Sequence, residues 1–291
     1  MNRSAPVGLL RVLLMLALCA VAVPGWAQSL RVMTFNVRLP VAADGENRWE
    51  ARRTLMAATI HRYRPDLFGT QELHKPQGDF LIERLHGYAW FGRDRRGGDS
   101  DEHVGVFYRT DRLQVVTSGD FWLSDTPEVP GSITWGNLYP RLTTWALFED
   151  RANHRRFYVY NTHLPYRDED EAARIRCAEL ILAHLARQPE DVPALVIGDF
   201  NTAPDSRVHA LLATRLSDAW LAAPEHRGPA ATFHGFTGHA DRRIDWIFAR
   251  GLLARRAHTI IDARNGRYPS DHFPVVVDFR WPRKGRLERQ P

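Results

Sequence analysis

The chain has 291 residues, a formal net charge of +5 and 44% hydrophobic residues. A chain of this length can bury a large core in one domain, and its mild basic excess permits a polyanionic partner without requiring one. With only two cysteines it cannot be a disulfide-rich scaffold, so its stability must come from the hydrophobic core.

The first 27 residues have the features of an export signal. Two arginines precede an apolar run, 12–23, that is too short to cross a bilayer. The small residues Gly25 and Ala27 suit a cleavage site directly after residue 27. We therefore expect export to the periplasm or the medium and removal of residues 1–27, which carry two arginines and no acid, so that the net charge falls to +3. Cys177 would then be the remaining cysteine, which excludes an intramolecular disulfide, and its helical segment predicts a packing role.

The rest of the chain alternates strand-like runs, rich in β-branched and aromatic residues, with segments of helical period. In chain order these are a strand at 30–37, a helix with Trp49, Met56, Ile60 and Tyr63 on one face, strands at 66–72, 103–108 and 156–164, a helix with Ile175, Ala178, Leu182 and Leu185 on one face, and strands at 193–201, 243–249 and 273–279. No linker interrupts this pattern, so we predict one α+β domain over 28–281 in which helices cover a sheet.

Each of three charged segments has a structural interpretation and a functional alternative. The acidic run 168–171 begins the second helix, where carboxylates favour the positive end of the helix dipole, and a metal role is the alternative. The loop 92–103 mixes both charges and predicts a solvated loop, with a calcium site as the alternative. The basic segment 282–291 predicts a disordered tail, with nucleic-acid contact as the alternative.

Polar residues stand at the ends of most of the predicted strands. They are Asn36, Glu72, His163, Asp199, Asn201, Asp245, Asp271 and His272. Each one alone fits an ordinary strand end or turn. Gathered at one sheet edge, however, they would form a cleft that is costly to bury without a ligand. Carboxylate and amide oxygens suit Mg²⁺ or Mn²⁺, whereas a structural zinc site would use cysteines or closely spaced histidines.

Six short motifs around these residues occur in a specific order. They are FNVR (35–38), GTQE (69–72), NTHLP (161–165), GDFN (198–201), RIDWIF (243–248) and SDHFPV (270–275). This ordered set resembles the endonuclease/exonuclease/phosphatase superfamily, which includes pancreatic-type DNases, apurinic endonucleases, inositol-phosphate 5-phosphatases and neutral sphingomyelinases. The resemblance covers nearly the whole mature chain. It implies a DNase I-like four-layered α/β/β/α sandwich with the active site between the edges of the two sheets.

The resemblance also implies a metal site. Glu72 would be the principal ligand of Mg²⁺ or Mn²⁺, and Asn36 and Asp271 would complete or support its shell. Such a cation helps to neutralise a phosphoester, which repels a nucleophile because it is already negative.

The remaining motif residues are implied to be catalytic. Asp199 and Asn201 would position the phosphate and the attacking water. His272 would be the general base, and Asp245 would orient its imidazole. His163 would donate a hydrogen bond to a phosphate oxygen.

Further substrate contacts are expected from arginines and aromatic residues. Arg109 and Arg141 are candidates for binding a phosphate oxygen, and surface positions are the alternative for each. Residues 121–141 are dense in Trp, Tyr and Pro and predict a rigid rim that stacks a base or a sugar. The alternative is a loop folded on the core, which we favour for Trp122.

We predict an exported, metal-dependent phosphoesterase that hydrolyses a phosphodiester by water attack, with a nuclease as one form. The alternatives are a phosphomonoesterase acting on a sugar or nucleotide, a sphingomyelinase-like phospholipase and, from another class, a binding module on the same fold. A binding module would not need all eight polar residues. The expected partner is a phosphoester, nucleic acid and nucleotides included, and no stable membrane insertion is expected after signal removal. The sequence leaves the oligomeric state open.

Overall fold

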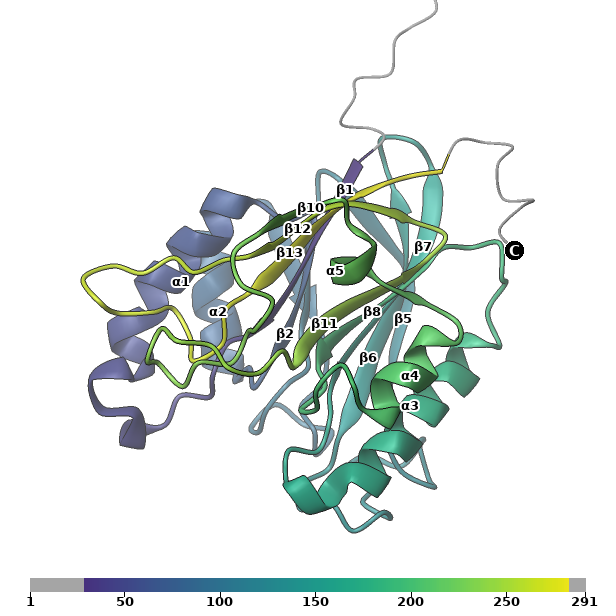
Figure 1. Ribbon diagram of the computed structural model, residues 1–291, viewed down its shortest axis with the longest axis horizontal. Helices are drawn as coiled ribbons and strands as arrows, with labels where there is room; N and C mark the ends of the chain where they lie inside the picture. The colour runs from purple at the N-terminus through teal and green to yellow at the C-terminus, as the bar shows by residue number, and fades with distance from the viewer. Residues whose placement is uncertain (1–28, 283–291) are drawn as a thin grey trace, which may run out of the picture.

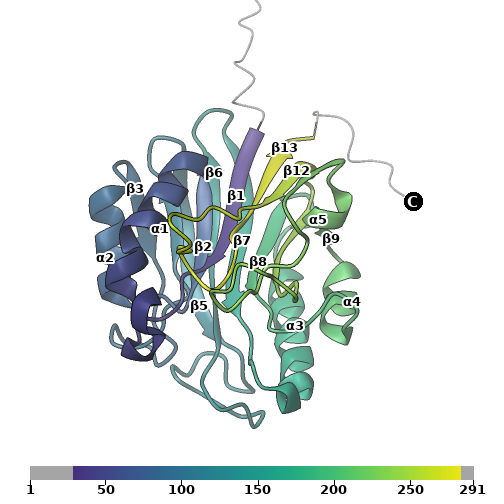
Figure 2. The ribbon, with the colours of Figure 1, turned by 60° about the vertical axis from the view of Figure 1, so that its left-hand side comes forward.

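Two β-sheets pack face to face, and helices cover the outer face of each sheet (Figures 1 and 2). The structure is a computed structural model that describes residues 29–282. The predicted signal, 1–27, and residues 283–291 of the predicted tail lie outside the described residues. The order of layers is helix, sheet, sheet, helix, so the predicted α/β/β/α sandwich is confirmed.

The first sheet has seven strands and contains both ends of the described chain. Its strands, in spatial order, are β10 (Glu225–Arg227), β12 (Leu253–Thr259), β13 (Val275–Arg280), β1 (Ser29–Asn36), β2 (Leu67–Gln71), β4 (Val106–Arg109) and β3 (Tyr88–Phe91). Strands β1 and β2 are parallel, with Asn36 opposite Gln71. Because parallel neighbours end at the same edge, Asn36 and the residue after Gln71, Glu72, lie together.

The second sheet has six strands. Their order is β5 (Leu113–Trp122), β6 (Leu142–Asp150), β7 (Arg155–His163), β8 (Ala194–Asp199), β11 (Asp245–Arg250) and β9 (Ser217–Asp218). The parallel pair β7 and β8 places His163 opposite Asp199, and the antiparallel strand β11 places Asp245 opposite Asp199 from the other side. Three polar residues thus meet at one edge of this sheet.

Alternation along the central strands fills the core on both faces of each sheet. Val32 of β1 points towards the second sheet, where it joins a cluster with Val159 and Ile197, whereas its neighbour Met33 packs under the outer helices. Helices α1 (Trp49–Tyr63) and α2 (Lys75–Arg84) cover the first sheet, and α3 (Glu171–Leu185) and α4 (Arg207–Ala213) cover the second. Short helices η2 (Ala42–Asn47), η3 (Asp168–Asp170) and α5 (Ala219–Ala222) lie in the connections.

The structure contains strands and helices beyond the predicted ones, and the buried face of one predicted helix differs. All seven predicted strands are present, but β3, β5, β6, β9, β10 and β12 are not among those seven, and helices α2 and α4 were not predicted. Most of these strands are short, exposed or partly polar and therefore lack a clean hydrophobic alternation. In α3 the buried face is centred on Cys177 and Ile181, while the predicted face residues Ile175 and Leu182 are only half-buried. Cys177, which belongs to this helix, is buried in the core between the helix and the second sheet, and it has the packing role that we predicted.

The acidic run before α3 is engaged in local ion pairs. Asp170, the residue before the helix, is buried and binds Arg167, with a nitrogen–oxygen distance of 2.6 Å. Glu171 lies in the first turn of α3 and binds Arg174 at 3.0 Å. The run lies at the N-terminal end of α3, where carboxylates favour the helix dipole, and these contacts provide no metal-binding arrangement.

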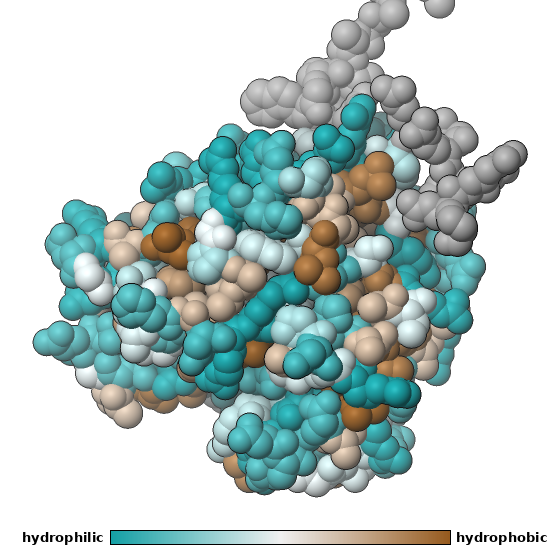
Figure 3. Space-filling model, viewed as in Figure 1, coloured by the Kyte–Doolittle hydropathy of each residue, from teal (hydrophilic) through white to brown (hydrophobic). Residues whose placement is uncertain are grey.

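Hydrophilic residues cover most of the face shown in Figure 3, where apolar side chains appear in small separate groups. Several large apolar side chains are exposed in the described chain, including Val129 and Leu138 in the segment that follows β5. Within residues 29–282, no helix has both the length and the apolar character that crossing a membrane would require.

Candidate active site

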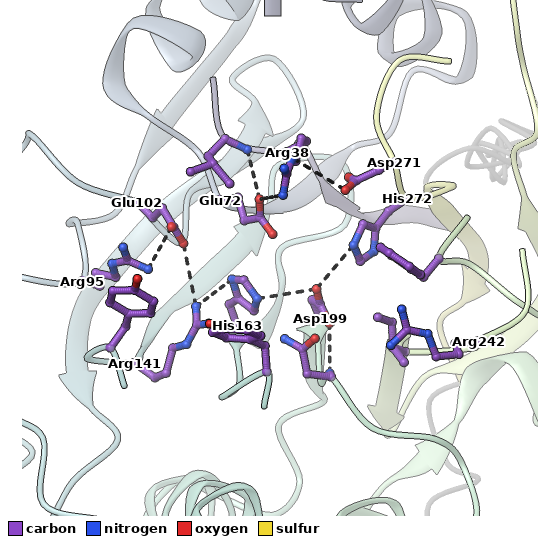
Figure 4. Close-up of a pocket in the computed structure, with 16 residues that line it drawn as sticks. Arg38, Glu72, Arg95, Glu102, Arg141, His163, Asp199, Arg242, Asp271 and His272 are labelled. Carbon is purple, nitrogen blue, oxygen red and sulfur yellow. Dashed lines mark hydrogen bonds and ion pairs between the residues drawn. The ribbon is translucent and has the colours of Figure 1, made fainter. Parts of the chain in front are cut away.

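A polar cleft of about 450 Å³ lies where the strand ends of the two sheets meet (Figure 4). All the predicted catalytic residues except Asp245 line it, and Asp245 lies directly behind His272. Of the predicted metal ligands, Glu72 and Asp271 line the cleft, and Asn36 bonds to the lining residues. The structure thus brings together the eight polar residues that the motifs singled out.

Two of these residues have a backbone conformation that side chains usually avoid. Glu72 follows β2 with a φ of 58°, and Asn201 follows β8 with a φ of 51°. Asparagine tolerates this left-handed region, but glutamate rarely adopts it. The turn at Glu72 redirects the chain at the strand end, and its carboxylate lies in the cleft, held by the backbone N–H of Leu39 at 3.0 Å. Such local strain is typical of functional sites.

Asn36 connects the two acidic residues contributed by different sheets. Its side-chain amide donates to Glu72 Oε1 at 3.0 Å and to Asp199 Oδ2 at 2.9 Å, while its oxygen accepts the backbone N–H of Arg38. One buried amide therefore fixes the spacing of the two carboxylates without adding charge.

His272 is held between two carboxylates. Its Nδ1 bonds to Asp245 Oδ2 at 2.8 Å, and its Nε2 lies 3.8 Å from Asp199 Oδ2. Asp199 is further held by the backbone N–H of Asn201 at 3.0 Å. The geometry matches an acid that orients an imidazole whose other nitrogen faces the reaction site.

Burial and charge shift the protonation of this group. Burial and the nearby Asp245 charge raise the pKa of Asp199 to about 7. Burial lowers the pKa of His272, but Asp245, Asp199 and Asp271 outweigh it and raise that pKa to about 10. Burial and the Glu72 charge also raise the pKa of Asp271. A bound cation would favour the deprotonated forms and lower all three pKa values.

His163 faces Asp199 from the opposite side and is held in one tautomer. Arg141 Nη1 lies 3.0 Å from His163 Nδ1, and an arginine can only donate, so the imidazole proton must be on Nε2. That nitrogen lies 3.6 Å from Asp199 Oδ2. Burial and the Arg141 charge hold the pKa of His163 well below its usual value, so this histidine is a neutral donor.

Arg141 belongs to a chain of contacts that ends at a loop the sequence did not connect to the site. Figure 4 shows the chain running from Arg95 through Glu102, Arg141 and His163 to Asp199. Arg95 binds Glu102 at 2.8 Å, and Glu102 lies 3.8 Å from Arg141. Arg95 and Glu102 both line the cleft.

The loop 92–103 that carries them is only in part the solvated loop that we predicted, because its middle is exposed while Asp94, Arg95, Glu102 and His103 are buried. Asp94 is fully buried, and its carboxylate accepts the backbone N–H groups of Arg96, Gly98, Ser100 and Asp101 at 2.8–3.0 Å. These bonds saturate the carboxylate, which leaves it no role in the alternative calcium site. The charged residues of this segment indicated a solvated loop because the groups that pair with them come together only when the loop folds.

Two predicted substrate-binding residues lie outside the cleft. Arg109 binds Asp66 at 2.9 Å and Asp111 at 2.7 Å, so the prediction that it contacts phosphate does not fit its position. Trp122 is buried beside Val104 and Leu142, and its indole N–H donates to the Arg95 carbonyl at 2.7 Å. It supports the cleft from behind, which agrees with the core alternative and corrects the rim assignment.

The cleft also contains residues that the motifs did not single out. Arg38 lies 3.9 Å from Glu72 and 3.8 Å from Asp271, and a bidentate pair with Asp44 anchors it. The other newly found lining residues are Leu39, Tyr139, Tyr166, Phe233, Arg242 and Ile244. Arg38 stands in FNVR with Leu39 directly after it, and Ile244 stands in RIDWIF, so motif reasoning could have found these three. Tyr139 lies in the segment 121–141 that was predicted to form a rim, whereas Tyr166, Phe233 and Arg242 were not indicated by any motif.

The donor chemistry of the site fits a hard divalent cation. Glu72 and Asp271 present carboxylates to the same cleft, and Asn36 retains a lone pair on its amide oxygen. Asp199, Asp245 and His272 form a second group, with ligand atoms within 4.8 Å of one another. The buried Asp245 Oδ1 has no hydrogen-bond partner in the described chain, so it is free to bind a cation or a proton.

Comparisons with known proteins agree with this geometry. The model of the Endonuclease/Exonuclease/phosphatase family matches residues 33–272, and enzymes of this family are metal-dependent phosphoester hydrolases. Human nocturnin is 24% identical over 88% of this chain, and the chain spans 66% of nocturnin's length. Mouse nocturnin is also 24% identical, over 86% of this chain and 65% of its own length.

Solved bacterial structures are more similar. A family member from Bacteroides vulgatus is 30% identical, with a TM-score of 0.83 over 87% of this chain and 99% of that one. A Bacteroides thetaiotaomicron mannosyl-6-phosphatase is 31% identical, with a TM-score of 0.81 over 86% of this chain and 99% of that one. The chain belongs to the Endonuclease/Exonuclease/phosphatase family.

Proposed function

We propose that the protein is an exported, divalent-metal-dependent enzyme that hydrolyses the phosphate ester of a small hydroxylated molecule, a sugar or a nucleotide. The observation that carries this proposal is the arrangement around Asp199, where two histidines converge inside a cleft of small-molecule size. The preferred substrate therefore differs from the phosphodiester expected from the sequence, and the phosphomonoesterase alternative gains weight.

The phosphate would bind against the two histidines. His163 Nε2 and His272 Nε2 lie 3.6 and 3.8 Å from the same carboxylate oxygen of Asp199. A phosphate oxygen beside Asp199 would meet the same two N–H donors, and Arg141 holds the first of them in the donating tautomer. Donors placed in advance stabilise the charge that develops on the phosphate during attack.

Either Asp199 or His272 would accept the proton of the attacking water. Both face the same point in the cleft, and Asp245 anchors the imidazole from behind. When a cation lowers their pKa values, one of the pair is available as a base near neutral pH, and this kind of assistance is worth about 10²- to 10⁴-fold in rate. Asn201 sits beside Asp199 without adding a charge that would repel the phosphate.

Glu72, Asp271 and Asn36 would hold the metal. When bound, Mg²⁺ or Mn²⁺ would offset the negative charge of the phosphoester and of the leaving oxygen. Arg38 lies between Glu72 and Asp271, where its positive charge separates the two carboxylates.

The charge and size of the cleft favour a compact substrate. Arg38 is neutralised by Asp44, and Arg95 by Glu102, so these arginines do not make the continuous basic track on which a polynucleotide backbone would lie. The 31% identity to a mannosyl-6-phosphatase, over 99% of that protein, supports a phosphate monoester. Export is supported by the signal-like residues 1–27.

The test is hydrolysis of mannose 6-phosphate, AMP, p-nitrophenyl phosphate, bis-p-nitrophenyl phosphate and single-stranded DNA with Mg²⁺, Mn²⁺ or chelator. We expect metal-dependent release of phosphate from a monoester, reduced about 10²- to 10⁴-fold in Asp199→Ala and unchanged in the surface control Asp111→Ala. Turnover of DNA or the diester at least tenfold above every monoester would contradict the proposed substrate.

Export has its own test. The mass of the protein recovered from the periplasm or medium of a bacterial host should match a chain that starts at Gln28. Recovery of the intact chain in the cytoplasm alone would contradict export.

A further inference from the structure

An aromatic stack lies at the end of the cleft near Arg95, outside the groups that handle the phosphate. The Tyr139 and Tyr166 rings stack with centroids 6.4 Å apart and an interplanar angle of 20°. The Arg95 guanidinium covers the Tyr139 ring at 4.3 Å. Both tyrosines line the same cleft as Asp199, yet Tyr166 remains 50% exposed. An exposed apolar ring beside a reaction centre is a surface on which part of a substrate can pack.

The backbone around both tyrosines is fixed in advance. The buried Arg174 donates to the carbonyls on either side of Tyr166, those of Pro165 at 2.9 Å and Arg167 at 2.7 Å. The Arg167 side chain in turn donates to the Gly136 carbonyl at 2.8 Å, which ties this segment to the one that carries Tyr139. A platform held this firmly loses little conformational freedom when a ligand binds.

The charges around the stack favour hydroxyl groups over a second phosphate. Arg95 is paired with Asp101 at 2.9 Å and with Glu102 at 2.8 Å, so it has no uncompensated positive charge. Glu102 lines the cleft and retains lone pairs that can accept hydrogen bonds from hydroxyl groups. An apolar ring surface beside such an acceptor matches a sugar, which has an apolar C–H face and a rim of hydroxyl groups.

We propose that Tyr166, Tyr139 and Glu102 form a subsite for a sugar ring in the leaving group of the phosphoester. The ring packs on the exposed tyrosine while its phosphate reaches Asp199, and its hydroxyl groups face Glu102. This assignment rests on the proposed function, because it names the alcohol whose phosphate is removed. A purine would stack on Tyr166 equally well but would bring few hydroxyl donors to Glu102.

The experiment compares Tyr166→Ala with wild type on glucose 6-phosphate, AMP and glycerol 3-phosphate, which has no ring. We expect the KM for glucose 6-phosphate to rise about tenfold, equivalent to about 1.4 kcal/mol, with kcat within about twofold. The KM for glycerol 3-phosphate should not change. Tyr166→Phe keeps the ring and should behave as wild type. Leu138→Ala removes another exposed side chain nearby, one outside the cleft lining, and is the matched control.

Each outcome separates the subsite from the proposed function. If wild type hydrolyses the monoesters but Tyr166→Ala raises the KM of all three equally, or of none, the subsite is wrong and the proposed function stands. If AMP is the better substrate and is the one that the substitution impairs, the ring is a base and the sugar assignment is overturned. If wild type hydrolyses none of them with Mg²⁺ or Mn²⁺, the proposed function fails, and the subsite with it.

Discussion

The two histidines that face Asp199 have opposite protonation states, and each state has a local cause. Burial and the Arg141 side chain, which donates to Nδ1, lower the pKa of His163 and keep it neutral, whereas Asp245 binds His272 Nδ1 and stabilises its charged form against burial. Two chemically identical side chains thereby differ in protonation when no metal is bound. Neighbours, and not residue type, decide the difference.

Stability in the absence of metal should depend on pH through this group. The pKa of His272 is raised to about 10 and that of Asp199 to about 7, so the folded protein holds more protons here than the unfolded chain does. The stability contributed by His272 is complete below its unfolded pKa of about 6.5 and is lost as the pH rises towards 10. The raised pKa of Asp199 acts in the same direction between its unfolded pKa of about 3.9 and its folded pKa of about 7.

We therefore expect the free energy of unfolding of chelator-treated protein, measured by urea denaturation, to fall between about pH 6 and pH 9 by a few kcal/mol. His272→Gln should show a smaller decrease, while the exposed control His154→Gln should follow wild type. Equal slopes in wild type and His272→Gln would contradict the assignment.

At the scale of elements, helix α1 supports two loops that carry site residues. Arg52 of α1 is fully buried and donates to the carbonyls of Val37 at 2.6 Å, Arg38 at 2.7 Å and Pro269 at 3.0 Å. Val37 and Arg38 directly follow Asn36, and Pro269 lies two residues before Asp271. Burial lowers the pKa of Arg52 to about 10, which leaves the side chain charged at neutral pH. One side chain thus connects the end of β1 to the start of β13.

Arg52→Met should keep the apolar stem but leave these carbonyls without a donor. Each unsatisfied buried group costs about 1–3 kcal/mol, so we expect the loss of at least about 3 kcal/mol of stability and a weaker affinity for Mn²⁺. Chemical denaturation and metal titration measure the two effects. Arg53→Met, on the exposed face of the same helix, is the control. A variant with unchanged stability and unchanged metal affinity would rule out this supporting role.

At the scale of the whole molecule, a buried polar cluster joins the two sheets next to the site. Asn161 of β7 accepts from the Gln71 side chain at 2.7 Å and donates to the carbonyls of Thr70 at 3.0 Å and Gly105 at 2.9 Å. A Cβ on Gly69 would collide with the Asn161 amide, which explains the glycine of the GTQE motif. Away from the site, apolar side chains such as Val32 and Ile197 fill the space between the sheets. The cluster therefore sets how β2 and β7 lie against each other beside Glu72 and His163.

Asn161→Leu should weaken this joint. The substitution removes three buried hydrogen bonds, and we expect it to lower the free energy of unfolding by about 2–4 kcal/mol and to reduce kcat/KM by shifting the two sheet edges. Gln114→Leu on the exposed face of β5 is the control. Thermal unfolding and steady-state kinetics test both effects, and wild-type values for Asn161→Leu would show that the apolar core alone sets the spacing of the sheets.

The sequence by itself determined the strand ends that build the candidate active site. Asn36, Glu72, His163 and Asp199 each follow an apolar run, and parallel neighbours place such ends at a common edge. That relation is local, because strand alternation and the polar residue that ends it are visible within a few positions. The motifs also indicated the pairing of Asp245 with His272, which the folded chain holds at 2.8 Å.

Only the tertiary structure decided the walls of the cleft. Arg95 and Tyr166 come from loops without periodicity, and their directions depend on contacts with distant residues, such as the bond from Trp122 to the Arg95 carbonyl. Arg109 and Arg141 both flank strands and are equivalent in sequence terms, yet only Arg141 has the cleft in front of it, while Asp66 binds Arg109 elsewhere. A charged side chain orients towards the oppositely charged or polar group that lies nearest to it, and the fold determines which group that is.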